Sequence, residues 1–222
     1  MRKLLALLIF AALSAACDYE TSITGLRFTD LKIHCTVFSI NQDRGLWLTA
    51  SHCVDSSTLI INEHSAFVFM FDAWKDLAIL HTEGYGVRAL PFCNEPPARG
   101  DKIFVSGHTW GWEGRTYLPG VIANPKQIFK IWDGQHQVDY PVMQFAIQGI
   151  APGNSGSPVV KEHCGVVSVL QGQWDGGVSA GADYDWLKSF VAGSWDMPAP
   201  QIDLMPRDFD DAPNGLVNPD TV

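Results

Sequence analysis

The chain has 222 residues, of which 46% are hydrophobic and 18% charged, so it can bury one large β-rich core or two smaller ones. Its formal net charge of −9 argues against a nucleic-acid partner.

The N-terminus has the pattern of an export signal. Arg2 and Lys3 precede an apolar run, 4–16, that is too short to span a bilayer as a mature helix. We therefore expect residues 1–16 to be a signal peptide, with a short buried helix as the alternative. The protein is then exported, to the periplasm or the cell envelope.

The residues before Cys17 (Leu13-Ser14-Ala15-Ala16) resemble a bacterial lipoprotein signal, although Ser14 stands where Leu is usual. The resemblance implies a lipid on Cys17 and attachment to a membrane. The alternative is cleavage after Ala16 to give a soluble exported protein. Five cysteines favour the lipid, because four then remain to form two disulfides in an oxidising compartment.

Short apolar runs separated by turn residues predict strands through most of the chain. After a polar tether at 17–31, a first β unit is expected over 32–92, with strands at 32–40, 45–49, 58–62, 65–71 and 76–81. The Gly- and Pro-rich residues 82–100 read as a linker. A second β unit is expected over 93–192, with strands at 101–106, 120–123, 127–132, 140–148, 157–161, 165–170 and 177–182.

Residues 184–192 have the apolar spacing of one short helix, and 193–222 form an acidic, Pro-rich tail that we expect to be disordered. The two β units have similar numbers of strands, which suggests a duplicated barrel. The pattern favours a barrel or sandwich over alternating strands and helices.

The segment 152–158 contains Ser155 between Gly153-Asn154 and Gly156. Glycines at these positions allow a tight turn that presents the Ser155 hydroxyl and two N–H groups to one point. Gly and Ser also make ordinary turns, so a catalytic serine needs a base and an acid elsewhere in the chain.

His52, within Thr49-Ala50-Ser51-His52-Cys53, follows a predicted strand and is a candidate base, since an imidazole titrates near neutral pH. Asp76 heads the apolar strand 77–80 and is the candidate acid. Asp72 is its rival, but we prefer Asp76 because the following strand can bury it.

These three motifs resemble the histidine, aspartate and serine motifs of chymotrypsin-like (trypsin-like) serine proteases, and the order His52, Asp76, Ser155 is that of the family. The resemblance implies an all-β fold of two packed six-stranded antiparallel Greek-key barrels with a short C-terminal helix. It also implies a serine endopeptidase that acts on polypeptides through an acyl-enzyme and needs no cofactor.

The resemblance assigns a role to each residue. Ser155 is the nucleophile, His52 the general base and Asp76 the group that orients the imidazole, while the N–H groups of Gly153 and Ser155 form the oxyanion hole. Asn154 departs from the Asp of members made as zymogens and matches the Gly-Asn-Ser-Gly form of bacterial and viral members. We therefore expect a site that forms on folding, without activating cleavage.

The resemblance also implies a disulfide between Cys35 and Cys53 that clamps the histidine loop. For Cys93 and Cys164 we expect a second disulfide, with two free thiols as the alternative. No Cys or His pair has the spacing of zinc ligands, so no metal site is expected.

For the substrate pocket, spacing from Ser155 puts Gly149 at the base. The resemblance puts Ser168, Val169 and Leu170 on the strand that pairs with substrate, and 176–178 on the opposite wall. The expected pocket is apolar and suits a small or medium aliphatic residue before the cleaved bond.

The aromatic loop 108–112 either edges the substrate cleft or packs between the barrels. Two further readings of the whole chain remain open at this point. One is a catalytically inactive relative that binds peptides, and the other is a structural envelope lipoprotein.

Overall fold

The computed structural model describes residues 21–28, 30, 32–54, 58–132, 137–174 and 178–197. The expected signal peptide, Cys17, the first part of the tether and all but five residues of the tail lie outside the described residues.

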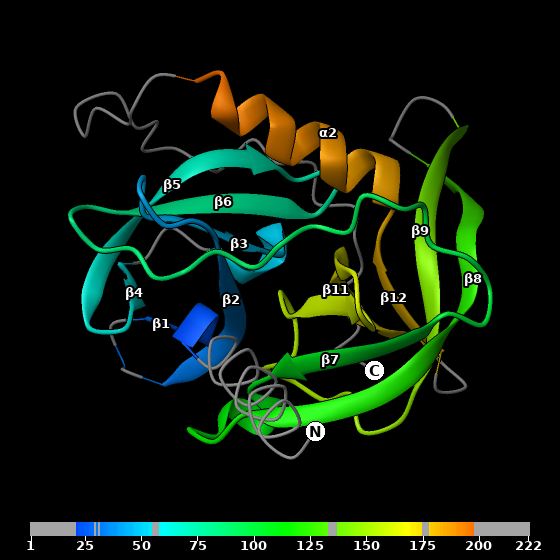
Figure 1. The fold of residues 1–222 in the computed structure, drawn as a ribbon, viewed down its shortest axis with the longest axis horizontal. Coiled ribbons are helices and arrows are strands. Elements are labelled where there is room, and N and C mark those ends of the chain that lie inside the picture. The colour runs from blue at the N-terminus through cyan, green and yellow to red at the C-terminus, as the bar shows by residue number, and fades with distance from the viewer. Residues whose placement is uncertain are drawn as a thin grey trace, which may run out of the picture.

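The first barrel is a closed sheet of six antiparallel strands, on the left of Figure 1. Its order is β1-β2-β3-β6-β5-β4, closed by pairing of β1 with β4. The strands are β1 (Ile23–Arg27), β2 (Ile33–Asn41), β3 (Leu46–Thr49), β4 (Leu59–Ile61), β5 (His64–Asp72) and β6 (Leu77–Thr82).

The second barrel repeats this arrangement, because its closed order β7-β8-β9-β12-β11-β10 matches that of the first barrel strand for strand. Its strands are β7 (Lys102–Gly107), β8 (Thr116–Trp132), β9 (Gln137–Ile147), β10 (Pro158–Lys161), β11 (Gly165–Trp174) and β12 (Val178–Ala182). Two short 3₁₀ helices, η1 (Ser51–Cys53) and η2 (Thr109–Gly111), interrupt the loops, and helix α2 (Tyr184–Trp195) follows β12.

The barrels and the helix share one apolar core. A cluster of buried side chains joins Phe38 of β2 to Val169 of β11 and Leu187 of α2. The helix begins with Asp183, whose side chain accepts the N–H groups of Asp185 and Trp186 and so caps the free donors of the first turn.

At the other end of α2, the Arg44 guanidinium donates to the carbonyl oxygens of Ser194, Trp195 and Met197. A cation is favourable where the helix dipole is negative. Helix α2 thus crosses from the second barrel to the first, as Figure 1 shows, and fixes one against the other.

The predicted all-β fold, with two six-stranded antiparallel barrels and a short C-terminal helix, is confirmed. Three boundaries are wrong. Residues 23–27, assigned to the tether, form β1, because the barrel closes only with a sixth strand. Residues 120–123 and 127–132 belong to one bulged strand, β8, and α2 runs three residues beyond Ala192.

No helix in the described part of the chain is long and apolar enough to cross a membrane.

Candidate active site

The predicted base and acid are in direct contact. The ring Nδ1 of His52 lies 2.8 Å from Oδ2 and 3.0 Å from Oδ1 of Asp76. Because a carboxylate only accepts, Nδ1 carries the proton and Nε2 of the neutral ring keeps its lone pair. The His52 side chain is 44% exposed and that of Asp76 only 8%, so the pair has one buried end and one accessible end.

Two further hydrogen bonds hold the Asp76 carboxylate. Oδ1 accepts the backbone N–H of His52 at 2.9 Å and the Ser51 hydroxyl at 3.0 Å. Residues 51–53 form η1, which turns this N–H and this hydroxyl toward the same oxygen. A buried carboxylate needs such partners, and here three of its donors come from the segment that carries the imidazole.

Asp76 sits in a sharp turn at the head of β6, with φ at 50°. Asp is among the few residues that adopt this left-handed conformation readily. The Gln171 side chain, from β11 in the second barrel, donates to the carbonyl oxygen of Lys75 at 2.7 Å and braces the turn. The rival Asp72 instead accepts the N–H of Lys75 and pairs with its ammonium group.

Ser155 lies in a tight turn between β9 and β10. Gly153 and Gly156 have φ values of 93° and 81°, which favour glycine. A Cβ on Gly153 would lie 2.1 Å from the carbonyl oxygen of His108, and one on Gly156 would lie 2.1 Å from the Thr49 hydroxyl. The flanking glycines are therefore required by both backbone conformation and space.

Asn154 closes the serine turn from inside. Its side-chain Oδ1 accepts the N–H of Ala151 at 3.3 Å, while its own N–H donates to the carbonyl oxygen of Ala151 at 3.1 Å. The residue is completely buried. A neutral amide is far less costly to bury there than an unpaired carboxylate.

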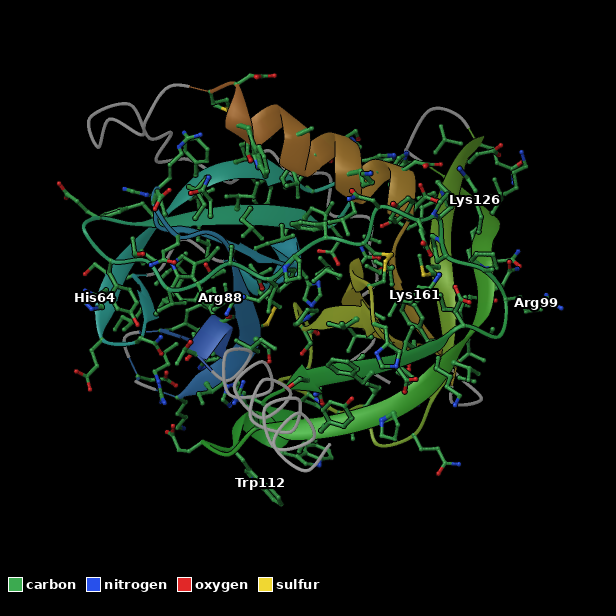
Figure 2. The ribbon with its side chains drawn as sticks, in the orientation of Figure 1. His64, Arg88, Arg99, Trp112, Lys126 and Lys161 are labelled. Carbon is green, nitrogen blue, oxygen red and sulfur yellow. A yellow bond between two sulfur atoms is a disulfide. The ribbon has the colours of Figure 1, made fainter. Side chains whose placement is uncertain are left out.

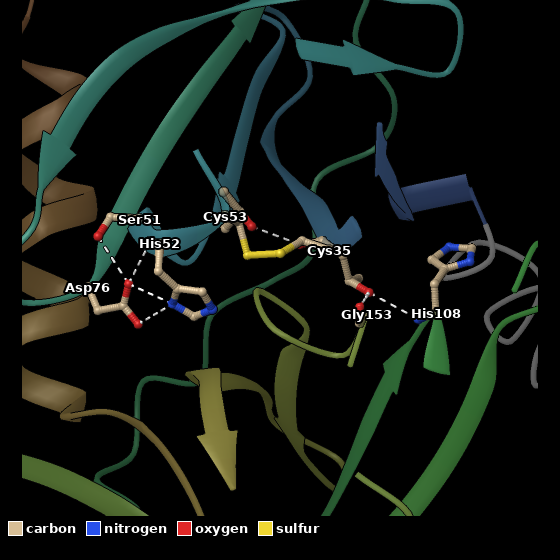
Figure 3. The surroundings of a disulfide bond; sticks show 9 residues. Cys35, Ser51, His52, Cys53, Asp76, His108 and Gly153 are labelled. Atoms are coloured by element: carbon tan, nitrogen blue, oxygen red, sulfur yellow. Dashed lines mark hydrogen bonds and ion pairs between the residues drawn. A yellow bond between two sulfur atoms is a disulfide. The ribbon is translucent and has the colours of Figure 1, made fainter. Parts of the chain in front are cut away.

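Strand β2 brings the serine and histidine segments together. The N–H of Thr36 donates to the carbonyl oxygen of Ser155 at 2.8 Å, and the neighbouring Cys35 forms a disulfide with Cys53, next to His52. Figure 3 shows this disulfide between the His52–Asp76 pair on one side and Gly153 on the other. Residues 35–36 thus contact both the serine turn and the neighbour of His52.

The N–H groups of Gly153 and Ser155 have no hydrogen-bond acceptor among the residues that the structure describes. By contrast, the N–H of Asn154, between them, is satisfied within the turn. Two free backbone donors beside a serine suit the binding of a negative oxygen, as the predicted oxyanion hole requires.

Two buried titratable groups flank the site. Burial raises the pKa of Tyr140 far above its ordinary value, and the charges of Asp76 and Asp72 add to the effect. Burial also lowers the pKa of His108; nearby Arg115 and Arg27 lower it further, whereas Trp112 and Glu113 act in the opposite direction.

The predicted substrate-binding residues of β11 require a correction. Ser168, Val169 and Leu170 are each 0% exposed and belong to the interior, so a substrate cannot touch them. Leu170 pairs instead with the serine turn, accepting the N–H of Gly156 at 2.8 Å. The strand reaches the surface only afterwards, at the partly exposed 171–173.

Gly149 lies on the exposed loop between β9 and the serine turn, with φ at 86°. The expected opposite wall at 176–178 falls outside the described residues except for Val178. The loop 108–112 packs against the serine turn, where the N–H of Trp110 donates to the carbonyl oxygen of Pro152 at 2.6 Å.

Sequence reasoning missed Thr36 and Gln171. Thr36 is a fully buried polar residue within the apolar strand β2, and such a residue needs a hydrogen-bond partner. Residues 165–170 are apolar except for Ser168, and Gln171 is the polar residue that follows them. It therefore indicates where the strand leaves the core. Both features are visible in the sequence, but neither predicts which residue accepts the hydrogen bond.

Cys93 and Cys164 form the second disulfide, which joins the start of the second barrel to the β10–β11 turn. Cys35, Cys53 and His52 offer ligand-type atoms within 4.8 Å of one another. Because both sulfur atoms belong to the disulfide, this group lacks the thiolates that a metal ion would need.

Comparison with known proteins adds a family and a fold. A family profile described as a trypsin-like peptidase domain matches residues 35–169, more than half of the chain. A comparison with curated protein sequences found no match.

The chain resembles many solved structures, among them three of proteases. The active form of the Rv3671c protease from M. tuberculosis matches with a TM-score of 0.69 and 22% identity, over 84% of this chain and 85% of that one. The inactive form of a mutant of the same protein matches with a TM-score of 0.68 and 22% identity, over 82% and 91%. A serine endoprotease from Yersinia pestis matches with a TM-score of 0.63 and 17% identity, over 81% and 65%.

Proposed function

Because the chain belongs to the trypsin-like peptidases, we propose that it is an exported serine endopeptidase that cleaves polypeptides through Ser155, His52 and Asp76. The single observation that carries the proposal is the contact between His52 Nδ1 and Asp76 Oδ2 at 2.8 Å, in a segment tied to the serine turn by β2.

In the proposed mechanism, the Ser155 hydroxyl attacks the scissile carbonyl carbon while His52 Nε2 takes its proton. The tetrahedral oxygen receives hydrogen bonds from the N–H groups of Gly153 and Ser155. His52 then protonates the leaving amine, the C–N bond breaks, and an acyl-Ser155 ester remains. Water, deprotonated by His52, releases the acid and restores the serine.

Asp76 acts through the imidazole. Its carboxylate holds the tautomer with the proton on Nδ1 and stabilises the imidazolium that forms during attack. Its burial and its bonds to Ser51 and to the backbone of His52 keep it in place for this purpose.

The enzyme is proposed to be active without cleavage of its N-terminus. Asn154 is neutral and is held by Ala151, so the turn needs no ammonium group to pair with a buried acid. A purified chain beginning upstream of β1 should hydrolyse peptides as soon as it folds. Activity that appears only after proteolysis would contradict this part of the proposal.

Export and the lipid on Cys17 rest on the N-terminal sequence. The two disulfides fit an oxidising compartment. Mass spectrometry of the mature N-terminus separates a lipidated Cys17 from a free one.

The proposed primary specificity rests on Gly149. With no side chain at the expected base of the pocket, we expect a small or medium aliphatic residue before the cleaved bond. Cleavage-site profiling on a peptide library tests this, and a preference for Arg or Lys would contradict it.

A covalent serine probe of the fluorophosphonate type tests the enzyme itself. The wild type should be labelled and should hydrolyse peptides, and Ser155→Ala should do neither. Ser157→Ala is a matched control, because Ser157 belongs to the same turn but is 0% exposed and should not react. A folded wild type that neither reacts nor cleaves would favour the inactive peptide-binding or structural alternatives.

A further inference from the structure

The orientation of the serine turn depends on groups outside it. In a trans peptide the C=O and the N–H point in opposite directions, and the described chain has no cis peptide bond. The Pro152 carbonyl oxygen accepts the N–H of Trp110 at 2.6 Å. Holding that oxygen toward η2 therefore aims the N–H of Gly153 away from η2, where it is free to bind an oxyanion.

Thr36 holds the next part of the turn with two hydrogen bonds. Its hydroxyl donates to the carbonyl oxygen of Gly153 at 2.8 Å, and its N–H donates to that of Ser155 at 2.8 Å. The same hydroxyl accepts the N–H of His108 at 3.0 Å. One buried side chain thus links the serine turn to the loop that carries Trp110.

These contacts oppose a rotation of the peptide groups in the serine turn. Two backbone N–H groups without acceptors are costly, and rotating one peptide group of the turn would let a donor find a partner inside the protein. That rotation would remove a donor from the oxyanion hole. With neutral Asn154 in the turn, no ion pair opposes the rotation. The Trp110 hydrogen bond holds the peptide group that carries the Gly153 N–H, and the two Thr36 hydrogen bonds hold the peptide groups that follow Gly153 and Ser155.

The loop carrying Trp110 contributes backbone rather than side chain. Trp110 has φ at 58° and is 64% exposed, while the nearby Trp112 projects away from the protein in Figure 2. His108, at the start of this loop, is buried and its ring Nδ1 lies 2.8 Å from the carbonyl oxygen of Trp112. The loop is therefore closed on itself and can serve as a fixed support.

From these contacts we infer that Thr36 is a positioning residue for the oxyanion hole. Its hydroxyl fixes the Gly153–Asn154 peptide directly. Through the N–H of His108 it also fixes the loop whose Trp110 N–H orients the Pro152–Gly153 peptide, which carries the Gly153 donor. The inference rests on the proposed peptidase function. It assigns to a single neutral side chain the role of keeping the turn in its active orientation.

The test is Thr36→Val, which removes the hydroxyl but keeps the N–H and the shape of the side chain. We expect kcat to fall about 10- to 100-fold, toward the range seen when one oxyanion donor is lost, with KM changed less than about threefold. Thr36→Ser keeps the hydroxyl and should retain most of kcat. A peptide boronate should bind Thr36→Val more weakly by a factor similar to the loss in kcat/KM.

Thr82→Val is the matched control. Thr82 is also fully buried in a strand of the first barrel, and its hydroxyl accepts the Nε1–H of Trp47 and donates to the carbonyl oxygen of Tyr85. It makes no bond to the serine turn, so Thr82→Val should lower stability while kcat per folded molecule stays within about twofold. If Thr36→Val does not fold, Thr36→Ala takes its place.

The outcomes separate the two proposals. An active wild type with kcat unchanged in the Thr36 variant, or lowered equally by Thr82→Val, overturns the positioning role alone. If Thr36→Ser loses as much kcat as Thr36→Val, the positioning role is also overturned. A wild type that neither cleaves peptides nor reacts with the fluorophosphonate overturns the proposed function and this inference with it.

Discussion

Asp76 binds His52 twice, through the ring Nδ1 at 2.8 Å and through the backbone N–H at 2.9 Å. The second bond fixes the main chain of the residue and the first fixes its ring, so the imidazole has little freedom to turn. The same carboxylate therefore sets both the tautomer and the direction of Nε2.

Asp76→Asn should lower kcat about 10³- to 10⁴-fold, because an amide can donate to Nδ1 and so favours the wrong imidazole tautomer. Its similar shape should preserve the fold. Asp72→Asn is the matched control, since Asp72 bonds to Lys75 and not to His52, and it should change kcat less than about threefold. Steady-state kinetics on a peptide substrate distinguish the two, and a larger effect at Asp72 would reverse the assignment.

The two disulfides should differ in their effect on catalysis. Replacing Cys35 and Cys53 by alanine should cost about 2–4 kcal/mol of stability and also lower kcat, because the bond joins the neighbours of Thr36 and His52. Replacing Cys93 and Cys164 should cost about 1 kcal/mol more, since that bond closes a longer loop, but should leave kcat nearly unchanged. Urea unfolding gives the stability and kinetics below the transition gives kcat. Equal losses of kcat would show that the first disulfide has no special link to the site.

The three catalytic motifs could be predicted because each is a short contiguous segment whose residue types state their chemistry. The residues that hold these motifs in place could not be predicted, because their partners are distant in the sequence. Thr36 binds Gly153, which is 117 positions away, and Gln171 binds Lys75, which is 96 positions away. Such contacts depend on how the two barrels pack against each other, which a local sequence pattern does not predict.

The β11 residues show a second limit. The apolar run 165–170 predicts a strand but not the position where it leaves the core. A register shift between Val159 and Val160 changes how β10 pairs with β11, and the strand continues to Trp174. The surface positions therefore begin at Gln171, after the residues Ser168–Leu170 that family resemblance suggested. Strand β1 escaped prediction for a related reason, since Ile23 and Leu26 are its only large apolar residues and polar sequence precedes it.

His108 should make the stability of the protein depend on pH. Its Nδ1 is engaged with Trp112, and its buried Nε2 has no partner among the described residues, so the folded state favours the neutral ring. Burial lowers the folded-state pKa below its value in the unfolded chain, which is about 6.5. Between these two values the unfolded chain binds more protons, so the free energy of unfolding falls as pH drops through the unfolded pKa and levels off below the folded one.

His108→Phe should remove this part of the pH dependence. The substitution also deletes the hydrogen bond to Trp112, but that loss is nearly the same at every pH and cancels in a comparison across pH. Urea unfolding at about pH 5 and pH 7.5 should show a larger drop toward acid for the wild type than for the variant. His64→Phe is the control, because His64 is an exposed residue at the edge of the first barrel (Figure 2) and a phenyl ring can keep its stacking on Tyr85, so the slope of the wild type should stay in place. Identical slopes in the wild type and His108→Phe would mean that His108 does not resist protonation in the folded protein.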